Sequence, residues 1–246
     1  MIAIVGTNHD DILYFETAMA NKKEDLLLKK YKITIGTIFN QEVLLIHGLN
    51  TSILSSVIVS TICSKYYIDL IIAVGRCFAM NKGLKVGDII IAEKVINIDV
   101  DQIDDNDVRL GQIPSLPQEF KVQTDVIGYI EEGLNKRAFT TGRRVSLLSS
   151  NDLSNNTLRR IRENVVSMFD LNKTAVDSIS GGVAVASYLY NVPFVSVKVV
   201  EKIVGEPWNI DHYLKVLDSY VGADKAIIAA IGDIGRNDVI IGGTRK

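Results

Sequence analysis

Short apolar runs of strand length recur along this chain and alternate with segments of helical spacing. Four of these runs are Met1–Gly6, Asp69–Gly75, Ile89–Ala92 and Val192–Val200. A continuous apolar run of this length predicts a strand buried on both faces, as in a parallel sheet between two layers of helices. No linker or shift in composition divides the chain. We therefore predict one α/β domain over residues 1–246, with a mixed, largely parallel central sheet flanked by helices.

The segments between these runs predict the remaining elements. Apolar residues at helical spacing predict a helix within 10–30, and alternation over 31–39 and 42–47 predicts a hairpin. Thr51 is placed to cap a helix that extends to about residue 67. Gly181 and Gly182 permit another helix to pack closely against a neighbour. Further helices are expected at 123–136, 155–164, 178–190 and 211–231, and a further strand at 144–148.

The composition excludes several classes of protein. The net charge of −2 implies no broad basic surface for nucleic acid. Two cysteines and three histidines predict neither a disulfide scaffold nor a metal site. The first residues do not resemble a secretory signal, and no apolar run approaches the roughly 18 residues that would cross a membrane. We expect a cytoplasmic protein with no cofactor and with neither a nucleic-acid nor a membrane partner.

Polar residues that directly follow the apolar runs are the candidates for a site, because α/β sheets bind ligands beyond the carboxyl ends of their strands. Asp10 and Asp11 follow the first run, where they suit either acid–base chemistry or the capping of the next helix. Gly75 and Arg76 suit a phosphate or a carboxylate, or form an ordinary turn. Cys77 has no partner that marks it as a nucleophile, so a buried filling role is favoured.

Two later segments are also candidates. Asp177 and Ser178 precede the Gly-Gly helix, where they suit the binding of a sugar diol or the capping of that helix. Glu201 and Lys202 end the run that begins at Val192. They form either a surface ion pair or, if the position is enclosed, a site in which Glu201 acts as a general acid.

The order of three motifs resembles a known family. GLKVGDIIIAEKV begins at Gly83, GQIPSLPQEFK begins at Gly111, and NVPFV begins at Asn191. Together they resemble the nucleoside phosphorylase superfamily, in particular its branch of 5′-methylthioadenosine/S-adenosylhomocysteine nucleosidases. This resemblance covers essentially the whole chain. It implies a homodimer that cleaves the bond between ribose and a purine, in which Ile103, Pro114 and Pro117 approach the partner's site.

The resemblance implies roles for individual residues. Asp11 falls at the water-activating carboxylate, one methylene shorter than the family's glutamate. Isoleucine at 179 replaces the glutamate that holds the ribose hydroxyls, and Lys202 falls at the acid that recognises the purine. A one-residue shift of the preceding strand, through a bulge, would give that place to Glu201. The ligand-binding positions carried over from the family, or suggested by these polar segments, are Asn8, Leu49, Gly75, Arg76, Cys77, Phe78, Asp177, Ser178, Lys198 and Lys202.

Three hypotheses follow. The first is an enzyme that cleaves the N-glycosidic bond by hydrolysis or phosphorolysis, with Asp11 and Glu201 as catalytic residues. Its substrate is a purine nucleoside, or an anionic derivative if Arg76, Lys198 and Lys202 surround it. The second is a homodimer that binds such a ligand without turnover. The third is a purely structural or interaction protein whose pocket is filled by Phe78 and Ile179. We predict that Asp11, Arg76 and one of Glu201 or Lys202 line one cavity.

Overall fold

A computed structural model describes residues 1–100, 109–136, 142–165, 167–207 and 209–236. It consists of one mixed sheet with the strand order β2-β3-β4-β1-β5-β11-β6-β10-β9-β7-β8, in which β11 also pairs with β7. The strands are β1 (Ile2–Val5), β2 (Ala20–Leu27), β3 (Tyr31–Ile38), β4 (Gln41–Ile46), β5 (Leu70–Ala73), β6 (Arg76–Ala79), β7 (Ile89–Asn97), β8 (Phe120–Lys121), β9 (Arg143–Ser149), β10 (Thr174–Asp177) and β11 (Phe194–Ile203).

Strand β11 joins the two halves of the sheet. Its first residues pair with β5, and Val199–Ile203 pair with β6. Because β11 also pairs with β7, the strands β6, β10, β9, β7 and β11 close into a ring, while β1–β5 extend from it as an open sheet. The pairings β1–β4, β1–β5, β5–β11, β6–β11, β9–β10 and β7–β9 are parallel. The predicted mixed α/β sheet is therefore confirmed.

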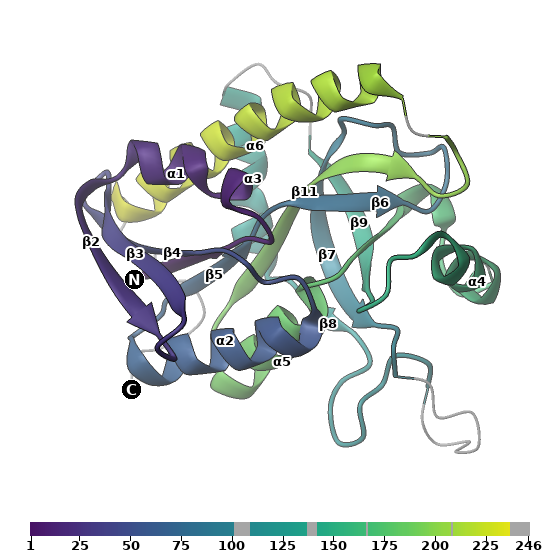
Figure 1. Cartoon of the computed structure of the whole chain (residues 1–246), viewed down its shortest axis with the longest axis horizontal. Helices are drawn as coiled ribbons and strands as arrows, with labels where there is room; N and C mark the ends of the chain where they lie inside the picture. Colours follow the sequence, from purple (N-terminus) through teal and green to yellow (C-terminus); the bar gives the residue numbers. More distant parts are fainter. Residues whose placement is uncertain (101–108, 137–141, 166, 208, 237–246) are drawn as a thin grey trace.

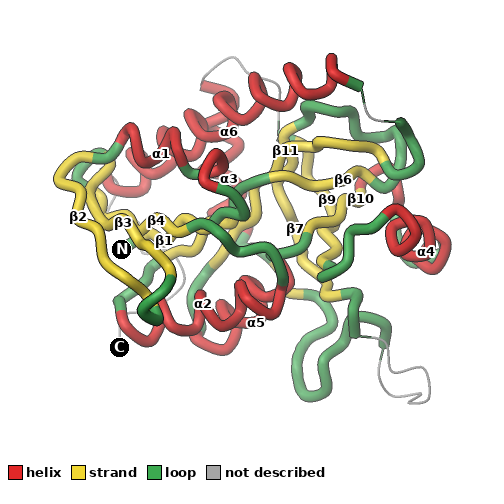
Figure 2. The backbone as a smooth tube through the Cα atoms, viewed as in Figure 1, coloured by secondary structure: helices red, strands yellow, loops and turns green. Residues whose placement is uncertain are grey.

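Helices cover both faces of the open sheet (Figure 1). Helices α1 (Leu13–Ala18), α3 (Thr124–Lys136) and α6 (Ile210–Arg236) lie on one face, and α2 (Ser52–Lys65) and α5 (Ser180–Tyr190) lie side by side on the other (Figure 2). Helix α4 (Asn155–Val165) packs beside the ring of strands, and the short 3₁₀ helices are η1 (His9–Asp11) and η2 (Leu171–Lys173).

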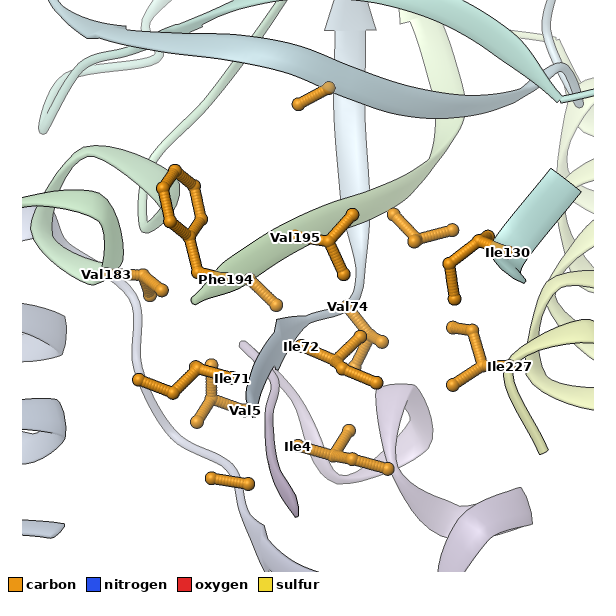
Figure 3. Close-up of a cluster of buried hydrophobic side chains, with 14 of the residues drawn as sticks. Ile4, Val5, Ile71, Ile72, Val74, Ile130, Val183, Phe194, Val195 and Ile227 are labelled. Carbon is orange, nitrogen blue, oxygen red and sulfur yellow. The ribbon is translucent and has the colours of Figure 1, made fainter. Parts of the chain in front are cut away.

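The core is continuous from one helical layer through the sheet to the other. Figure 3 shows Ile4 and Ile72 of neighbouring strands between Ile227 of α6 on one side and Val183 of α5 on the other. All four residues of β1 and of β5 are buried, as their apolar runs predict. The ends of β1 and β5 are thereby held in fixed positions, and these are the ends from which the candidate site begins.

Close packing of α2 against α5 depends on glycine. A Cβ added at Gly182 would lie only 1.9 Å from the carbonyl oxygen of Ser52. The two helices also share hydrogen bonds, since Ser55 Oγ donates to the carbonyl oxygen of Ile179 at 2.8 Å. The predicted cap of α2 is present, with Thr51 Oγ1 accepting from the backbone N–H of Leu54 at 3.1 Å.

One prediction about local structure is wrong, and so is one of the two alternatives given for Arg76. The helix expected within 10–30 ends at Ala18, and β2 takes up residues 20–27. Strand β2 lies at the edge of the sheet and is exposed along most of its length, so its charged side chains remain in solvent and obscure the strand pattern. The turn suggested at Arg76 is instead strand β6, which pairs with both β10 and β11.

Candidate functional site

Asp11 lies directly beyond the carboxyl end of β1, in η1, and is 1% exposed. Its Oδ2 accepts hydrogen bonds from the backbone N–H groups of Thr7 at 2.9 Å and Asn8 at 2.7 Å. Its Oδ1 has no hydrogen-bond partner. Burial raises the pKa of Asp11, although the two N–H groups and the charges of Lys198 and Arg76 act in the opposite direction. The carboxyl group is fixed at one oxygen and available at the other.

Gly75 brings the backbone after β5 against this carboxyl group. Its φ of +123° is in the region that favours glycine, and a Cβ added there would lie 3.0 Å from Asp11 Oδ2. The following residue, Arg76, begins β6 and places its guanidinium group on the same side of the molecule. A side chain at position 75 would therefore crowd the Asp11 carboxyl group. The sequence alone does not reveal this requirement for glycine.

A β-bulge brings Glu201 to Arg76. Val200 pairs with Cys77 and Lys202 pairs with Phe78, so Glu201 is the extra residue in β11. Its Oε1 accepts from Arg76 Nη1 at 2.8 Å, and both side chains are about a quarter exposed. A bulge in this strand is the condition stated above for Glu201 to take the place expected for Lys202.

Lys202 points away from this pair. Its Nζ donates to Asn155 Oδ1 of α4 at 3.1 Å, and the contact is exposed. The structure thus brings Asp11, Arg76 and Glu201 to one side of the ring of strands and leaves Lys202 at α4. Because consecutive strand residues face opposite ways, the bulge decides which of the two charged neighbours lies near Asp11.

Lys198 and Asp177 form a buried ion pair at 3.1 Å, with side chains 0% and 2% exposed. Lys198 Nζ also donates to the carbonyl oxygen of Val74 at 2.9 Å. The carboxylate of Asp177 accepts from the backbone N–H and from Oγ of Ser180, the latter at 2.6 Å. Both charges therefore have close protein partners, and the pair ties β10 and β11 to the start of α5.

Other positions proposed as ligand contacts differ in their surroundings. Leu49 is buried in the main apolar core, as is Ile179, the residue expected in place of a glutamate, while Phe78 packs against a second cluster beside α4. Asn8 is exposed. Burial raises the pKa of the Cys77 thiol far above its usual range, which fits the filling role predicted for it.

Comparison with known proteins now adds to this geometry. A family model described as the phosphorylase superfamily matches residues 2–231. The chain belongs to the phosphorylase superfamily. A 5′-methylthioadenosine/S-adenosylhomocysteine nucleosidase of Staphylococcus aureus is 22% identical over 234 residues, which cover 95% of this chain and 100% of that protein.

Solved structures of the same superfamily share the fold. The nucleosidase of Neisseria meningitidis, in complex with methylthio-immucillin-A, superposes with a TM-score of 0.83 at 19% identity and covers 94% of this chain and 98% of its own. The nucleosidase of Colwellia psychrerythraea, in complex with adenine, gives a TM-score of 0.82 at 17% identity and covers 94% of each chain. At these identities the likeness establishes the architecture of this phosphorylase-superfamily chain.

The proline-bearing segment of this superfamily member lies at the surface. Pro114 is exposed and Pro117 is half-buried, in a segment that projects from the body of the molecule beside β8 (Figure 1). Gln118 Nε2 ties the segment back to the carbonyl oxygen of Leu110 at 2.8 Å. Ile103 lies outside the described residues.

Sequence inspection missed two polar residues of α6 that face the site. The ring of Tyr220 lies over the guanidinium group of Arg76, with Cζ 5.6 Å from the ring centroid. Asp224, one turn later, is 4% exposed, and burial followed by the charge of Asp11 raises its pKa to about 8. Burial also raises the pKa of Tyr220, with Asp11 as the next cause. The sequence does contain a signal for Asp224: this acidic residue lies three positions before Ile227, on the apolar face of α6 that packs into the core.

Among the residues that the structure describes, no group of three or more His, Cys, Asp or Glu side chains could hold a metal ion. In the same residues, no helix combines the length and the apolar character needed to cross a membrane.

Proposed function

We propose that this protein hydrolyses the N-glycosidic bond of a purine nucleoside. The observation that carries the proposal is the Asp11 carboxyl group, which is buried, held through one oxygen by two backbone N–H groups and free at the other. Such a group can accept a proton from water as the water oxygen attacks the ribose carbon. The relatives support the same chemistry, since they are named as nucleosidases and two were solved with adenine or methylthio-immucillin-A.

The charges favour a neutral nucleoside over an anionic derivative. Arg76 is paired with Glu201, and Lys198 is paired with Asp177. The third expected cation, Lys202, lies at α4. An anion would have to displace a carboxylate from one of these pairs, whereas a neutral ligand would not. The same pairing favours water over phosphate as the attacking group.

Glu201 has a binding role in this proposal. A carboxylate that is ion-paired with a guanidinium group accepts hydrogen bonds and does not supply a proton. We therefore assign Glu201 to the recognition of an N–H group on the purine, in place of the general-acid role suggested by the sequence. The departing base takes its proton from solvent.

Binding without turnover is the second candidate, and Ile179 favours it. This side chain is 1% exposed and belongs to the apolar core, at the position where the family has the glutamate that holds the ribose hydroxyls. Loss of that carboxylate removes a means of fixing the sugar, and fixing the reacting groups is a large part of catalysis.

A homodimer belongs to the same proposal. The outer surface of α2 and α5 exposes large apolar side chains at Ile53, Val57, Tyr188, Leu189 and Tyr190. Helix α2 has apolar residues on its exposed side, at Ile53 and Val57, as well as on the side that faces the core, at Ile58 and Ile62. Contact with a second copy of the chain would cover this surface, and Pro114 and Pro117 would then approach the partner's site.

Release of free base is the deciding measurement. Methylthioadenosine, S-adenosylhomocysteine, adenosine and inosine are each incubated with the protein, with and without phosphate. We expect release that does not require phosphate and is abolished in Asp11→Asn. Asp10→Asn is the matched control, because Asp10 is the exposed neighbour in the same 3₁₀ helix. Thermal stabilisation by a nucleoside without any release would favour the binding protein instead.

A further inference from the structure

Three buried polar atoms without a hydrogen-bond partner belong to neighbouring side chains. They are Asp11 Oδ1, Arg76 Nε and Tyr220 Oη, and among the described residues the other such atom is Ser187 Oγ of α5. Asp11 packs against Gly75, which directly precedes Arg76, and Tyr220 lies over the Arg76 guanidinium group. Buried polar groups are almost always hydrogen-bonded, so three exceptions in one place indicate a position that binds a polar group.

We propose that these three atoms together bind one hydroxyl group, supplied either by a water molecule or by an alcohol of the ligand. The inference rests on the proposed function, because it assigns a partner to the free oxygen of Asp11. It adds Tyr220 to the site and gives Arg76 Nε a direct contact with the bound group. Both positions lie outside the three motifs through which the chain resembles the nucleosidases.

The donor and acceptor properties of the three atoms define the bound group. Arg76 Nε can only donate, and a carboxylate oxygen of Asp11 can only accept. The bound group must therefore accept from one side and donate to the other, which a hydroxyl does. An oxygen without a proton would place its lone pairs against Asp11, and an ammonium group would place its protons against Arg76. The Tyr220 hydroxyl can serve as the third partner in either direction.

The surroundings restrict the direction of Arg76 Nε. Glu201 holds Nη1 at 2.8 Å, and Arg76 Cζ lies over the Tyr220 ring, 5.6 Å from the ring centroid. Because the guanidinium group is planar, the contact at Nη1 restricts the directions in which the Nε–H bond can point. Tyr220 thus lies beside Arg76 through its ring, and in this proposal its hydroxyl group contacts the bound group.

Tyr220→Phe tests the hydroxyl while keeping the ring, and Tyr213→Phe is the control on an exposed position of the same helix. Crystals of the wild-type protein are examined alone and after soaking with adenosine. We expect an oxygen atom within hydrogen-bond distance of Asp11 Oδ1, Arg76 Nε and Tyr220 Oη, and its loss in Tyr220→Phe. An oxygen that remains water in the soaked crystal identifies water, and replacement by a ribose hydroxyl identifies the ligand.

Base-release kinetics provide the second measurement. We expect Tyr220→Phe to lower the rate about tenfold, as the loss of one hydrogen bond predicts, and Tyr213→Phe to match the wild type. The decrease falls on kcat if the hydroxyl is water and on KM if it belongs to the nucleoside. Arg76→Lys, which keeps the charge but removes Nε, should also lose the bound oxygen.

Failure of the two proposals can be distinguished. If the wild type releases no base, the proposed function fails and the crystals alone decide the hydroxyl position. A wild-type crystal with no oxygen near Asp11 Oδ1 and Arg76 Nε overturns the inference. So does a Tyr220→Phe protein that keeps both the bound oxygen and the wild-type rate.

Discussion

Removal of the Lys198 charge should destabilise this protein strongly. The ammonium group lies 3.1 Å from Asp177 Oδ2, and both side chains are inaccessible to solvent. At that separation, and with an effective dielectric constant of about 20, the attraction is worth about 5 kcal/mol. Lys198→Met keeps the length of the side chain but leaves the Asp177 carboxylate without its counter-charge. Breaking one side of a buried ion pair costs about 3–5 kcal/mol, in agreement with the Coulomb value.

The measurement is urea unfolding followed by far-UV circular dichroism, at one fixed protein concentration because assembly would alter the apparent stability. Asp177→Asn and the double variant complete a double-mutant cycle. We expect each single variant to lose about 3–5 kcal/mol of unfolding free energy and the double variant to lose less than the sum of the two. A Lys198→Met protein within about 1 kcal/mol of the wild type would refute this reasoning, because it would mean that the pair is not needed in the fold.

Three further predictions concern packing, capping and pH. Gly182→Ala should cost more than about 3 kcal/mol of unfolding free energy, because its Cβ would meet the backbone oxygen of Ser52; a normal urea midpoint would contradict the observed α2–α5 packing. Thr51→Ala should cost about 1 kcal/mol through loss of the helix cap, measurable in the same assay, and an unchanged midpoint would show the cap to be dispensable. Burial, with Asp11 second, raises the pKa of Asp224 to about 8, so the folded state holds a proton that the unfolded state releases above pH 4. Stability should therefore fall from pH 4 to 8, by on the order of 5 kcal/mol from this group. Asp224→Asn should flatten that fall, and the exposed Asp218→Asn should not.

The central strands and most helices can be predicted from the sequence. A strand that is buried on both faces consists almost entirely of apolar residues, which makes it easy to recognise. The runs of β1 and β5 contain only apolar residues, and all of those residues are buried. Strand β2 has no such apolar run. It is an edge strand exposed along most of its length, and its lysines and acidic residues are equally typical of a helix exposed to solvent. The expected helix there is wrong because the polar pattern does not distinguish these two cases.

The candidate site is predictable only where a residue follows a strand in the chain. Asp11 and Arg76 are found in this way, at the ends of the β1 and β5 runs. The choice between Glu201 and Lys202 depends on a bulge, and one extra residue in a strand has no signature in the sequence of that strand alone. Tyr220 reaches Arg76 through the packing of α6 on the sheet, a contact between residues that are 144 positions apart.

The Lys198–Asp177 pair and the cluster around Asp11 are both buried and polar, but they differ in whether their polar atoms have partners within the protein. In the Lys198–Asp177 cluster each charge has close partners, from Val74 and Ser180 as well as from each other. A cluster satisfied in this way has no free polar atom to offer a ligand, and its contribution is to the fold. Around Asp11, in contrast, three buried polar atoms lack partners, and each such atom costs about 1–3 kcal/mol.

A fold does not retain such a cost where an apolar side chain would remove it, unless the polar atoms are used. Ile179 is buried in the apolar core, at a position where the resemblance to the nucleosidases implies a carboxylate. The polar atoms of Asp11, Arg76 and Tyr220 have not been exchanged in that way, even though Tyr220 could lose its hydroxyl and keep its ring on Arg76. Buried polar atoms without hydrogen-bond partners are expected at functional sites. The cost therefore supports the proposed ligand position between the end of β1 and the inner face of α6, and not at the Lys198–Asp177 pair, despite the greater charge of that pair.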